Sequence, residues 1–311
     1  REQCAAITTE FENIPAETLA QFSGFLPVSP DAQSVAIAQN RIIEKQYLQN
    51  NGFAVAPFAV IEQTADIEAV QDLFPGILKV SQFGYDGKGQ RHVSNQAELK
   101  AAFDDLNAEP CVLEKKLPLK YEISVILARA ANGDMESFPV IENQHVNGIL
   151  DVSIVPARVN SSLIQQADEV ARRLADTLNY CGVLCVEFFI LQDDQLLINE
   201  IAPRPHNSGH FSIDACVTSQ FEQQVRALCN LPLGNAALHQ PCVMVNLLGD
   251  IWQNGNPDWT QVLREPSVKL HLYGKSQARP GRKMGHFTVM DDTVEKALAR
   301  ALHIRESLTT H

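Results

Sequence analysis

Two glutamates, Glu187 and Glu200, offer the most distinctive chemistry in this sequence. They lie in two apolar runs, residues 183–191 and 195–201, which are joined at Asp193-Asp194. If these aspartates form a two-residue hairpin turn, the two carboxylates face each other across adjacent strands. Because like charges directly opposite destabilise a sheet and close carboxylates resist ionising together, we expect a cation between them. Hard oxygen ligands favour magnesium, carried in on phosphate oxygens. The alternative is an ordinary hairpin with one exposed and one half-buried glutamate.

A polar, turn-rich segment follows the second of these runs directly. It contains Arg204, His206 and Asn207, which supply a cation, a titratable imidazole and an amide within four residues. A segment of this composition straight after a buried strand favours a reactive site over an ordinary hairpin.

A glycine-rich segment at residues 81–90 lies between two short predicted strands. It carries Gly84, Gly87, Gly89 and the embedded Lys88. Glycines free the backbone to approach a ligand and to turn its N–H groups inward. A strand follows rather than a helix, and Lys88 lacks a following Ser or Thr, so neither the dinucleotide fingerprint nor a Walker loop fits. The segment fits a hairpin flap over phosphate, or a flexible surface hairpin without a ligand.

Four further residues are weaker candidates for a site. Lys79 ends an apolar run and is costly to bury unless it meets an anion such as phosphate, although an edge-strand lysine in solvent is the alternative. Glu114 opens a segment that fits an adenine pocket, and Glu122 has the opposite parity to the apolar residues of its strand. For His145, a structural role and a functional one are equally compatible with the sequence.

A basic segment stands out in an otherwise acidic chain. The net charge is −12, which argues against nonspecific nucleic-acid binding. Between positions 264 and 286 there are nevertheless six Lys or Arg residues against one acid, Glu265. This segment predicts either a small-anion site or a solvated basic face.

The predicted elements that would position these residues alternate between strands and helices. Residues 1–30 contain one partial strand at 4–8 and resemble the tail of an α/β unit. Strands are predicted at 56–61, 76–80, 90–93, 111–114, 122–130, 242–248, 269–273 and 286–289. Helices are predicted at 35–49, at 98–106, from a cap at Ser161 or Ser162 to Leu178, and at 218–230.

Bulk composition places the chain among soluble globular proteins of two or three domains. It has 311 residues, 45% hydrophobic and 20% charged. No apolar run approaches the roughly 18 residues of a membrane helix, and no signal-peptide pattern opens the sequence. Seven widely spaced cysteines without a CxxC pair predict reduced thiols in a cytoplasmic protein.

Taken together, the motifs resemble the ATP-grasp enzymes and, within them, the 5-(carboxyamino)imidazole ribonucleotide synthases of purine biosynthesis. The resemblance spans nearly the whole chain in family order. Its most specific strings are Asn-Glu-Ile-Ala-Pro-Arg-Pro-His-Asn-Ser-Gly-His at 199–210 and Arg-Pro-Gly-Arg-Lys-Met-Gly-His at 279–286. It also covers 9–13, 40–41, 77–79, 83–90 and Glu187.

This resemblance implies an α/β fold of the α+β ATP-grasp type. The expected division is an incomplete N-terminal Rossmann-like unit at 1–40, a central ATP-grasp domain at 41–230 and a small β-rich C-terminal domain at 231–311. The family begins with a strand and a Gly-Gly-Gly-Gln-Leu-Gly-Arg-Met-like turn that has no counterpart here, and the first residue is Arg1. We therefore expect either a truncated chain or a protein that lacks part of the substrate pocket.

The resemblance further implies ATP- and bicarbonate-dependent carboxylation of aminoimidazole ribonucleotide through carboxyphosphate, in a homodimer that binds neither nucleic acid nor membrane. Magnesium or manganese would be held by Glu187 and Glu200. The implied ATP-binding residues are Arg41, Lys79, Gly84, Tyr85, Asp86, Gly87, Lys88, Gly89, Glu114, Lys115, Lys116, Leu117, Glu122, His145, Asn199 and Glu200. The implied bicarbonate and ribonucleotide residues are Tyr85, Asp86, Arg204, His206, Asn207, Lys275, Arg282 and Lys283. Another ATP-grasp carboxylate–amine ligase and an inactive nucleotide-binding remnant are the competing hypotheses.

Overall fold

The computed structural model describes residues 3–11, 13–82, 84 and 89–309. Its helices cover Ala16–Ser23 (α1), Ala32–Gln39 (α2), Arg41–Asn50 (α3), Gln96–Asp105 (α4), Ser161–Thr177 (α5), Ser212–Ala215 (α6), Gln220–Leu228 (α7), Thr260–Leu263 (α8) and Val294–Thr309 (α9). The strands are Phe58–Ile61 (β1), Gly76–Val80 (β2), Gln90–Val93 (β3), Cys111–Lys115 (β4), Leu119–Arg129 (β5), Met135–Ser137 (β6), Ile141–Val146 (β7), Ile149–Val155 (β8), Gly182–Leu191 (β9), Leu196–Ala202 (β10), Cys242–Leu248 (β11), Val268–Leu272 (β12) and Lys283–Met290 (β13). The chain thus alternates helices and strands, as the sequence predicts.

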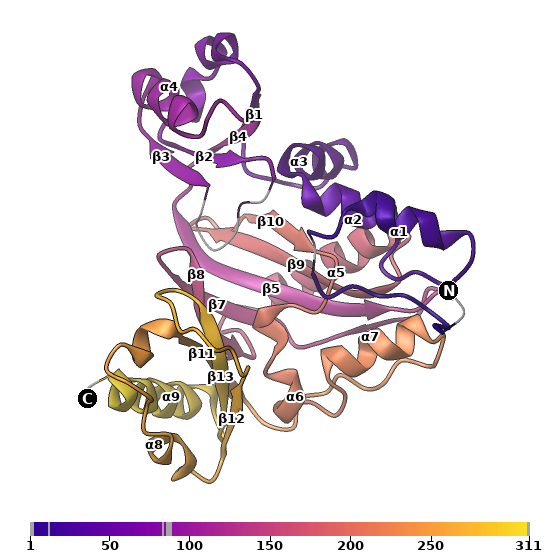
Figure 1. Cartoon of the computed structure of the whole chain (residues 1–311), viewed down its shortest axis with the longest axis vertical. Helices are drawn as coiled ribbons and strands as arrows, with labels where there is room; N and C mark the ends of the chain where they lie inside the picture. The colour runs from indigo at the N-terminus through magenta and orange to yellow at the C-terminus, as the bar shows by residue number, and fades with distance from the viewer. Residues whose placement is uncertain (1–2, 12, 83, 85–88, 310–311) are drawn as a thin grey trace.

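The strands form two sheets. A small antiparallel sheet has the order β1-β4-β2-β3 and packs against α4 in a lobe of its own at the top of Figure 1. A larger sheet has the order β10-β9-β5-β7-β8-β11-β13-β12, with β6 paired to β5. Helix α3 lies between the small sheet and strand β10, so it can contact both (Figure 1).

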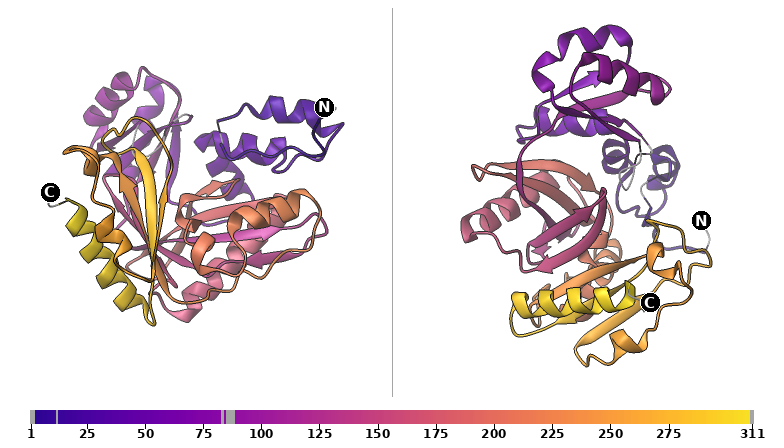
Figure 2. Two further views of the ribbon diagram at one scale, coloured as in Figure 1. Left: turned by 60° about the horizontal axis from the view of Figure 1, so that its bottom comes forward. Right: turned by 90° about the vertical axis from the view of Figure 1, so that its left-hand side faces the viewer.

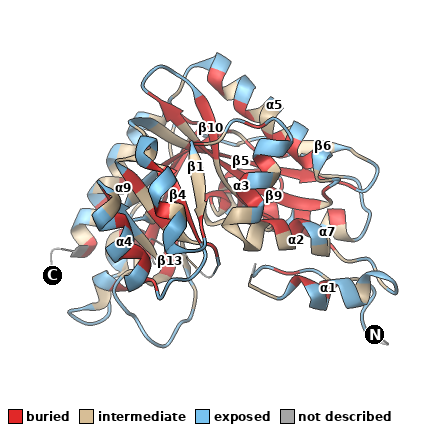
Figure 3. Cartoon of the chain, turned by 90° about the horizontal axis from the view of Figure 1, so that it is seen from above, coloured by how far each residue is buried: buried red, intermediate tan, exposed pale blue. Residues whose placement is uncertain are grey.

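The centre of the larger sheet is covered on both faces. One face packs on α5, whose residues Leu163, Ala167 and Leu174 join Val186 and Phe188 in the main core. With Ala171, these α5 residues recur at spacings of four, four and three, which is the apolar stripe of an amphipathic helix. The opposite face carries a second apolar cluster that includes Phe211 and Ala215. In Figure 3 the buried residues accordingly follow strands β5 and β9.

The C-terminal part of the chain extends the same sheet rather than forming a separate one. Strand β11 pairs with β8 and with β13, and α9 packs on β11 and β13. Figure 2 shows α9 lying along these strands at the side of the molecule away from the small sheet. The division at residues 40 and 231 stays a prediction.

Three local predictions were wrong, two of them because of helix capping. The helix predicted at 35–49 is two helices, because Asn40 is extended and its side chain accepts hydrogen bonds from the N–H groups of Ile42 and Ile43. The long helix is capped by Asn160 rather than by a serine, since its first residue is Ser161. Residues 4–8 form no strand but one isolated bridge, Ile7 to Val28.

The turn of the carboxylate hairpin was also predicted wrongly. The N–H of Leu191 donates to the carbonyl of Gln195, so the loop has three residues, 192–194, and ends on Asp194 with φ 62°. Alone, this would shift the pairing by one residue. One extra residue on β10, Asn199, restores it: Ile198 pairs with Phe188, whereas Glu200 pairs with Glu187. The facing glutamates are therefore confirmed, but they depend on a β-bulge.

Candidate functional site

A cleft of about 570 Å³ lies between the two sheets. Its walls come from β2 and β3 of the small sheet, from β5, β7, β9 and β10 of the larger sheet, and from α3. The sequence-predicted residues that line it are Arg41, Lys79, Gly84, Gly89, Glu122, His145, Glu187, Asn199, Glu200, Arg204, His206, Asn207 and Lys283. Most of the described candidates from distant parts of the sequence are thus brought to one cavity.

Glu187 and Glu200 face each other in this cleft but have opposite electrostatic environments. Burial, and then the charge of Glu200, raise the pKa of Glu187 above its ordinary value. Burial also disfavours ionisation of Glu200, but Arg41 outweighs it and lowers the pKa of Glu200. The two atoms that form this ion pair, Arg41 Nη1 and Glu200 Oε2, are 2.9 Å apart. Glu200 is therefore held ionised by Arg41, whereas the ionised form of Glu187 needs a further cation beside it.

This pair fits a divalent cation that prefers oxygen ligands. The two carboxylates are cross-strand partners, and their mutual repulsion contributes to the raised pKa of Glu187. Asn199, next to Glu200, has a buried side-chain oxygen that finds no hydrogen-bond partner among the described residues. Three oxygen donors and the repulsion between two of them match what Mg²⁺ or Mn²⁺ requires.

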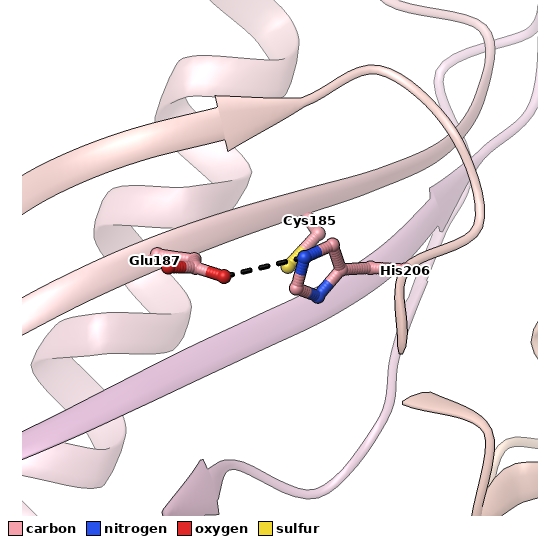
Figure 4. Close-up of side chains that lie close together, drawn as sticks. All are labelled: Cys185, Glu187 and His206. Carbon is pink, nitrogen blue, oxygen red and sulfur yellow. Dashed lines mark ion pairs between the residues drawn. The ribbon is translucent and has the colours of Figure 1, made fainter. Parts of the chain in front are cut away.

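His206 approaches Glu187 from the segment after β10. Its Nε2 lies 3.3 Å from Glu187 Oε1, and Figure 4 shows the two side chains pointing toward each other beside Cys185. Burial, and then the charges of Arg204 and Lys283, lower the pKa of His206, so the imidazole is neutral. Burial raises the pKa of the Cys185 thiol well above its ordinary value, which makes this cysteine a poor metal ligand.

A chain of buried polar side chains fixes the ring of His206. Its Nδ1 accepts from the N–H of Ser208 at 3.3 Å and lies 2.9 Å from Ser208 Oγ. Ser208 Oγ lies 3.0 Å from Ser124 Oγ, which in turn accepts from Asn143 Nδ2 at 2.9 Å. Because Nδ1 accepts, the ring proton is on Nε2 and is directed at Glu187. Ser124, Asn143 and Ser208 are fully or almost fully buried.

Lys79 and Glu114 form a buried ion pair at the small-sheet side. Lys79 Nζ lies 3.1 Å from Glu114 Oε2, and Lys45 Nζ lies 3.5 Å from the other oxygen. Burial opposes ionisation of Glu114, yet the two lysines hold its pKa below the ordinary value. The anion beside Lys79 is therefore a carboxylate of the chain itself, while Lys79 still lines the cleft.

Glu122 and His145 make a third pair in the lining. His145 Nδ1 lies 3.0 Å from Glu122 Oε2. Burial tends to lower the pKa of His145, but the hydrogen bond and charge of Glu122, together with the charges of Glu187 and Glu200, outweigh it and raise that pKa. His145 is on β7, which a tight turn at Asn147-Gly148 connects to β8; both turn residues have positive φ. An Asn-Gly pair between alternating residues is the strongest short hairpin signal, and it was missed.

The glycine-rich segment joins an antiparallel pair, as predicted. β2 and β3 pair from Gly76 with Val93 to Lys79 with Gln90, and Val80 N–H donates to Gly89 O. Gly89 has φ 73°, and a Cβ there would come within 2.6 Å of Val80, so this position requires glycine. Gly84 and Gly89 line the cleft. Tyr85, Asp86, Gly87 and Lys88 fall outside the described residues.

Some candidates lie away from the cleft lining. Lys115, Lys116 and Leu117 follow the buried Glu114 at the end of β4, where Lys116 N–H donates to Pro75 O. Lys275 Nζ donates to the carbonyl of Lys283 at 2.6 Å, and Arg282 donates to Gln277 O at 2.8 Å. From the basic segment 264–286, the described residue that reaches the lining is Lys283.

Two buried charged residues of α3 were not predicted as part of the site. Glu44 is 2% exposed and lines the cleft, and Lys45 is fully buried behind it. Burial raises the pKa of Glu44 to about 8. Their position in the sequence could have revealed them. Residues 41, 44, 45 and 48 share one face of the helix, and Leu48 on that face belongs to the hydrophobic core. Charged residues on a core-facing stripe indicate buried polar contacts.

Comparisons with known proteins agree on one family. The ATP-grasp domain family matches residues 46–221, and the phosphoribosylaminoimidazole carboxylase C-terminal domain matches 242–300. The N5-carboxyaminoimidazole ribonucleotide synthases of Bacillus subtilis and Brucella melitensis are 45% and 42% identical to the chain, over 91% of it and 74% and 78% of their own lengths. The Aspergillus clavatus N5-carboxyaminoimidazole synthase, solved with ADP and 5-aminoimidazole ribonucleotide, superposes with a TM-score of 0.90 at 30% identity, covering 99% of this chain and 82% of that one.

Among the described residues, no helix is both long enough and apolar enough to span a membrane. All seven cysteines are free thiols.

Proposed function

The chain belongs to the N5-carboxyaminoimidazole ribonucleotide synthase family of ATP-grasp ligases, and from this premise we propose how its cleft works. The reaction is the ATP-dependent carboxylation of aminoimidazole ribonucleotide in purine biosynthesis. We propose bicarbonate as the carbon source and carboxyphosphate as the intermediate. A bicarbonate oxygen attacks the γ-phosphorus of ATP and ADP leaves. The exocyclic amine of the ribonucleotide then forms a bond to the carboxyl carbon, or to the CO2 released from it, and phosphate leaves.

The nucleotide end of the cleft consists of Arg41, Lys79, Glu122, His145 and the glycine-rich segment. Its cations neutralise phosphate oxygens, and Glu114 keeps Lys79 oriented through the 3.1 Å ion pair. From the sequence resemblance, we assign the adenine to residues 114–117, at the end of β4. Gly84, Gly89 and the residues between them would cover the phosphates and exclude water, which otherwise hydrolyses carboxyphosphate.

Glu187 and Glu200, assisted by Asn199, would hold Mg²⁺ or Mn²⁺ between the two ends. When bound, the cation neutralises charge on the β- and γ-phosphates during transfer. Arg41 holds Glu200 in the ionised state that a ligand must have, since it keeps the pKa of that carboxyl low. This support from a cation of the chain explains how Glu200 stays ionised opposite Glu187.

The acceptor end consists of Arg204, His206, Asn207 and Lys283. Burial, and then the charges of Arg204 and Lys283, lower the pKa of His206 and of nearby His210. The two cations suit this end to bicarbonate and a ribonucleotide phosphate. His206 presents its Nε2 proton to Glu187 in the described state. Lys275 and Arg282 would support this end from behind, because Lys275 holds the carbonyl of Lys283. Tyr85 and Asp86 belong to the same proposal from the sequence resemblance alone.

The observation that carries this proposal is the pair of facing carboxylates in a cleft with basic side chains at each end, Arg41 and Lys79 at one and Arg204 and Lys283 at the other. The experiment is release of ADP from ATP by the full chain with each acceptor in turn. ADP release that requires bicarbonate and aminoimidazole ribonucleotide together supports the proposal. Release that depends on formate or on biotin would assign the chain to a different ATP-grasp ligase, and ATP binding without turnover under any acceptor would indicate an inactive remnant.

We also propose that the protein is a cytoplasmic homodimer. Seven free thiols support a reducing compartment. The dimer rests on the family resemblance, and light scattering in solution tests it: a mass near 34.4 kDa, that of one chain, would contradict it.

A further inference from the structure

The bulge at Asn199 decides which face of β10 carries Glu200. Ile198 of β10 pairs with Phe188 of β9. The next two residues of β10, Asn199 and Glu200, lie opposite the single residue Glu187, which precedes Phe188 on β9. Without the extra residue, Asn199 would be opposite Glu187. Glu200 would then project from the other face of the sheet, because a shift of one residue reverses every side chain. The pairing of the two carboxylates therefore requires that the bulge be held in place.

A bulge frees backbone groups that need other partners. Strand β10 is at the edge of the larger sheet, with α3 beside it. Lys45 Nζ donates to the carbonyl of Asn199 at 2.7 Å, and the N–H of Ile201 donates to Glu44 Oε1 at 2.7 Å. Glu200, which lies between Asn199 and Ile201, forms its ion pair with Arg41, also on α3. One face of α3 thus holds three successive residues of the bulge.

Burying the charged side chains of Glu44 and Lys45 is unfavourable unless their bonds to β10 compensate for it. Glu44 and Lys45 are 2% and 0% exposed, and burying charged groups is unfavourable unless they are paired and hydrogen-bonded. Lys45 also lies 3.5 Å from Glu114 of the small sheet. It therefore connects the bulge of one sheet to the Lys79–Glu114 pair of the other.

We propose that Glu44 and Lys45 are positioning residues that hold the β10 bulge and thereby keep Glu200 opposite Glu187. The proposal rests on the proposed function for its consequence, because the position of Glu200 matters through the divalent cation and the triphosphate. It assigns neither residue a contact with substrate. Their effect is exerted through the backbone of Asn199 and Ile201.

The test compares Glu44→Gln, Glu44→Leu and Lys45→Met in the full chain. Glutamine keeps an oxygen that can accept from Ile201 N–H, whereas leucine does not. The control is Gln46→Leu, which adds the same side chain on the exposed side of the same helix. Two quantities are measured: hydrogen exchange of the Ile201 amide without ligands, and binding of Mn²⁺ in the presence of ADP.

We expect Glu44→Leu to speed exchange of the Ile201 amide by about tenfold, with Glu44→Gln and Gln46→Leu close to the unaltered chain. Mn²⁺ affinity should fall by about tenfold in Glu44→Leu and Lys45→Met and be kept in Glu44→Gln. A folded Glu44→Leu protein with unchanged exchange and Mn²⁺ affinity overturns the proposal, and so does equal loss in the Gln and Leu variants. Amide exchange needs no turnover, so failure of the carboxylation assay leaves this test intact.

Discussion

The two ends of the cleft are charged in different ways. At the nucleotide end, cations are matched by carboxylates of the chain: Arg41 by Glu200, and Lys79 by Glu114. At the acceptor end, Arg204 and Lys283 lie among imidazoles whose pKa values are lowered by burial and by these charges. The first arrangement holds ligands in fixed positions, and the second creates a positive potential. A reaction that transfers phosphate and then adds a carboxyl group to an amine needs both.

The hairpin of β9 and β10 connects these ends. Glu187 contacts His206 of the acceptor end, while Glu200 contacts Arg41 of the nucleotide end. A change in the hairpin should therefore damage both halves of the reaction. A change at one end should damage one half.

The largest effect is expected for Glu200→Ala. It removes a cation ligand and leaves Arg41 without its carboxylate, so ADP formation should fall by about 10²- to 10³-fold while the protein stays folded. ADP release is measured at saturating ATP, bicarbonate and ribonucleotide, with circular dichroism to verify folding. Exposed Glu68→Ala serves as the control and should keep full activity. Normal turnover in Glu200→Ala would refute the metal assignment.

Lys79→Met tests the nucleotide end alone. Loss of a charge-assisted contact with phosphate should raise the KM for ATP by about ten- to a hundredfold. Glu114 keeps Lys45 at 3.5 Å, so its buried charge is still partnered and the fold should persist. Initial rates with each substrate varied in turn give the three KM values. An equal rise in the KM for the ribonucleotide would contradict the assignment of Lys79 to the nucleotide end alone.

Lys275→Ala tests the acceptor end from outside the lining. Its contact with Lys283 is a single hydrogen bond to a carbonyl, so we expect only a several-fold rise in the KM for the ribonucleotide. The Kd for ATP, measured by calorimetry, should not change. Equal losses in ATP binding and in carboxylation would contradict this division of roles.

The smallest effect concerns stability and pH. Burial, and then Lys283 and Arg204, lower the pKa of His210 to about 4 from an ordinary 6.5. Between these values the unfolded chain binds a proton that the folded chain does not. Stability is therefore lost as pH falls from 6.5 towards 4, by at most about 3 kcal/mol from this group. The difference in unfolding free energy between the unaltered chain and His210→Gln, followed by urea titration across this range, should shrink as pH falls. A difference independent of pH would contradict the lowered pKa of His210.

Periodicity in the sequence predicts much of this molecule, and local hydrogen bonds account for what it missed. Apolar runs located both strands of the carboxylate hairpin, and apolar residues at helical spacing from Leu163 to Leu174 located α5. The pairing of Glu187 with Glu200 was right although its turn was wrong, because Asn199 compensates for the third loop residue. A bulge stabilised by α3 has no local signature in the strand that contains it.

The remaining misses have a similar origin. Glu44 and Lys45 contact residues more than 150 positions away, so their burial depends on tertiary structure. The break at Asn40 was readable from its capping chemistry, and β7 and β8 from Asn147-Gly148. The number of charges in the basic segment 264–286 did not predict which of its residues line the cleft. Among the described residues of this segment, Lys283 is the one that does.

The most direct test of the central claim is the location of Mn²⁺ in crystals of the full chain grown with ADP, from its anomalous scattering. The account predicts one site in the cleft, within coordination distance of carboxylate oxygens of both Glu187 and Glu200. A manganese ion that contacts only one of these glutamates, or that binds outside the hairpin, would contradict it.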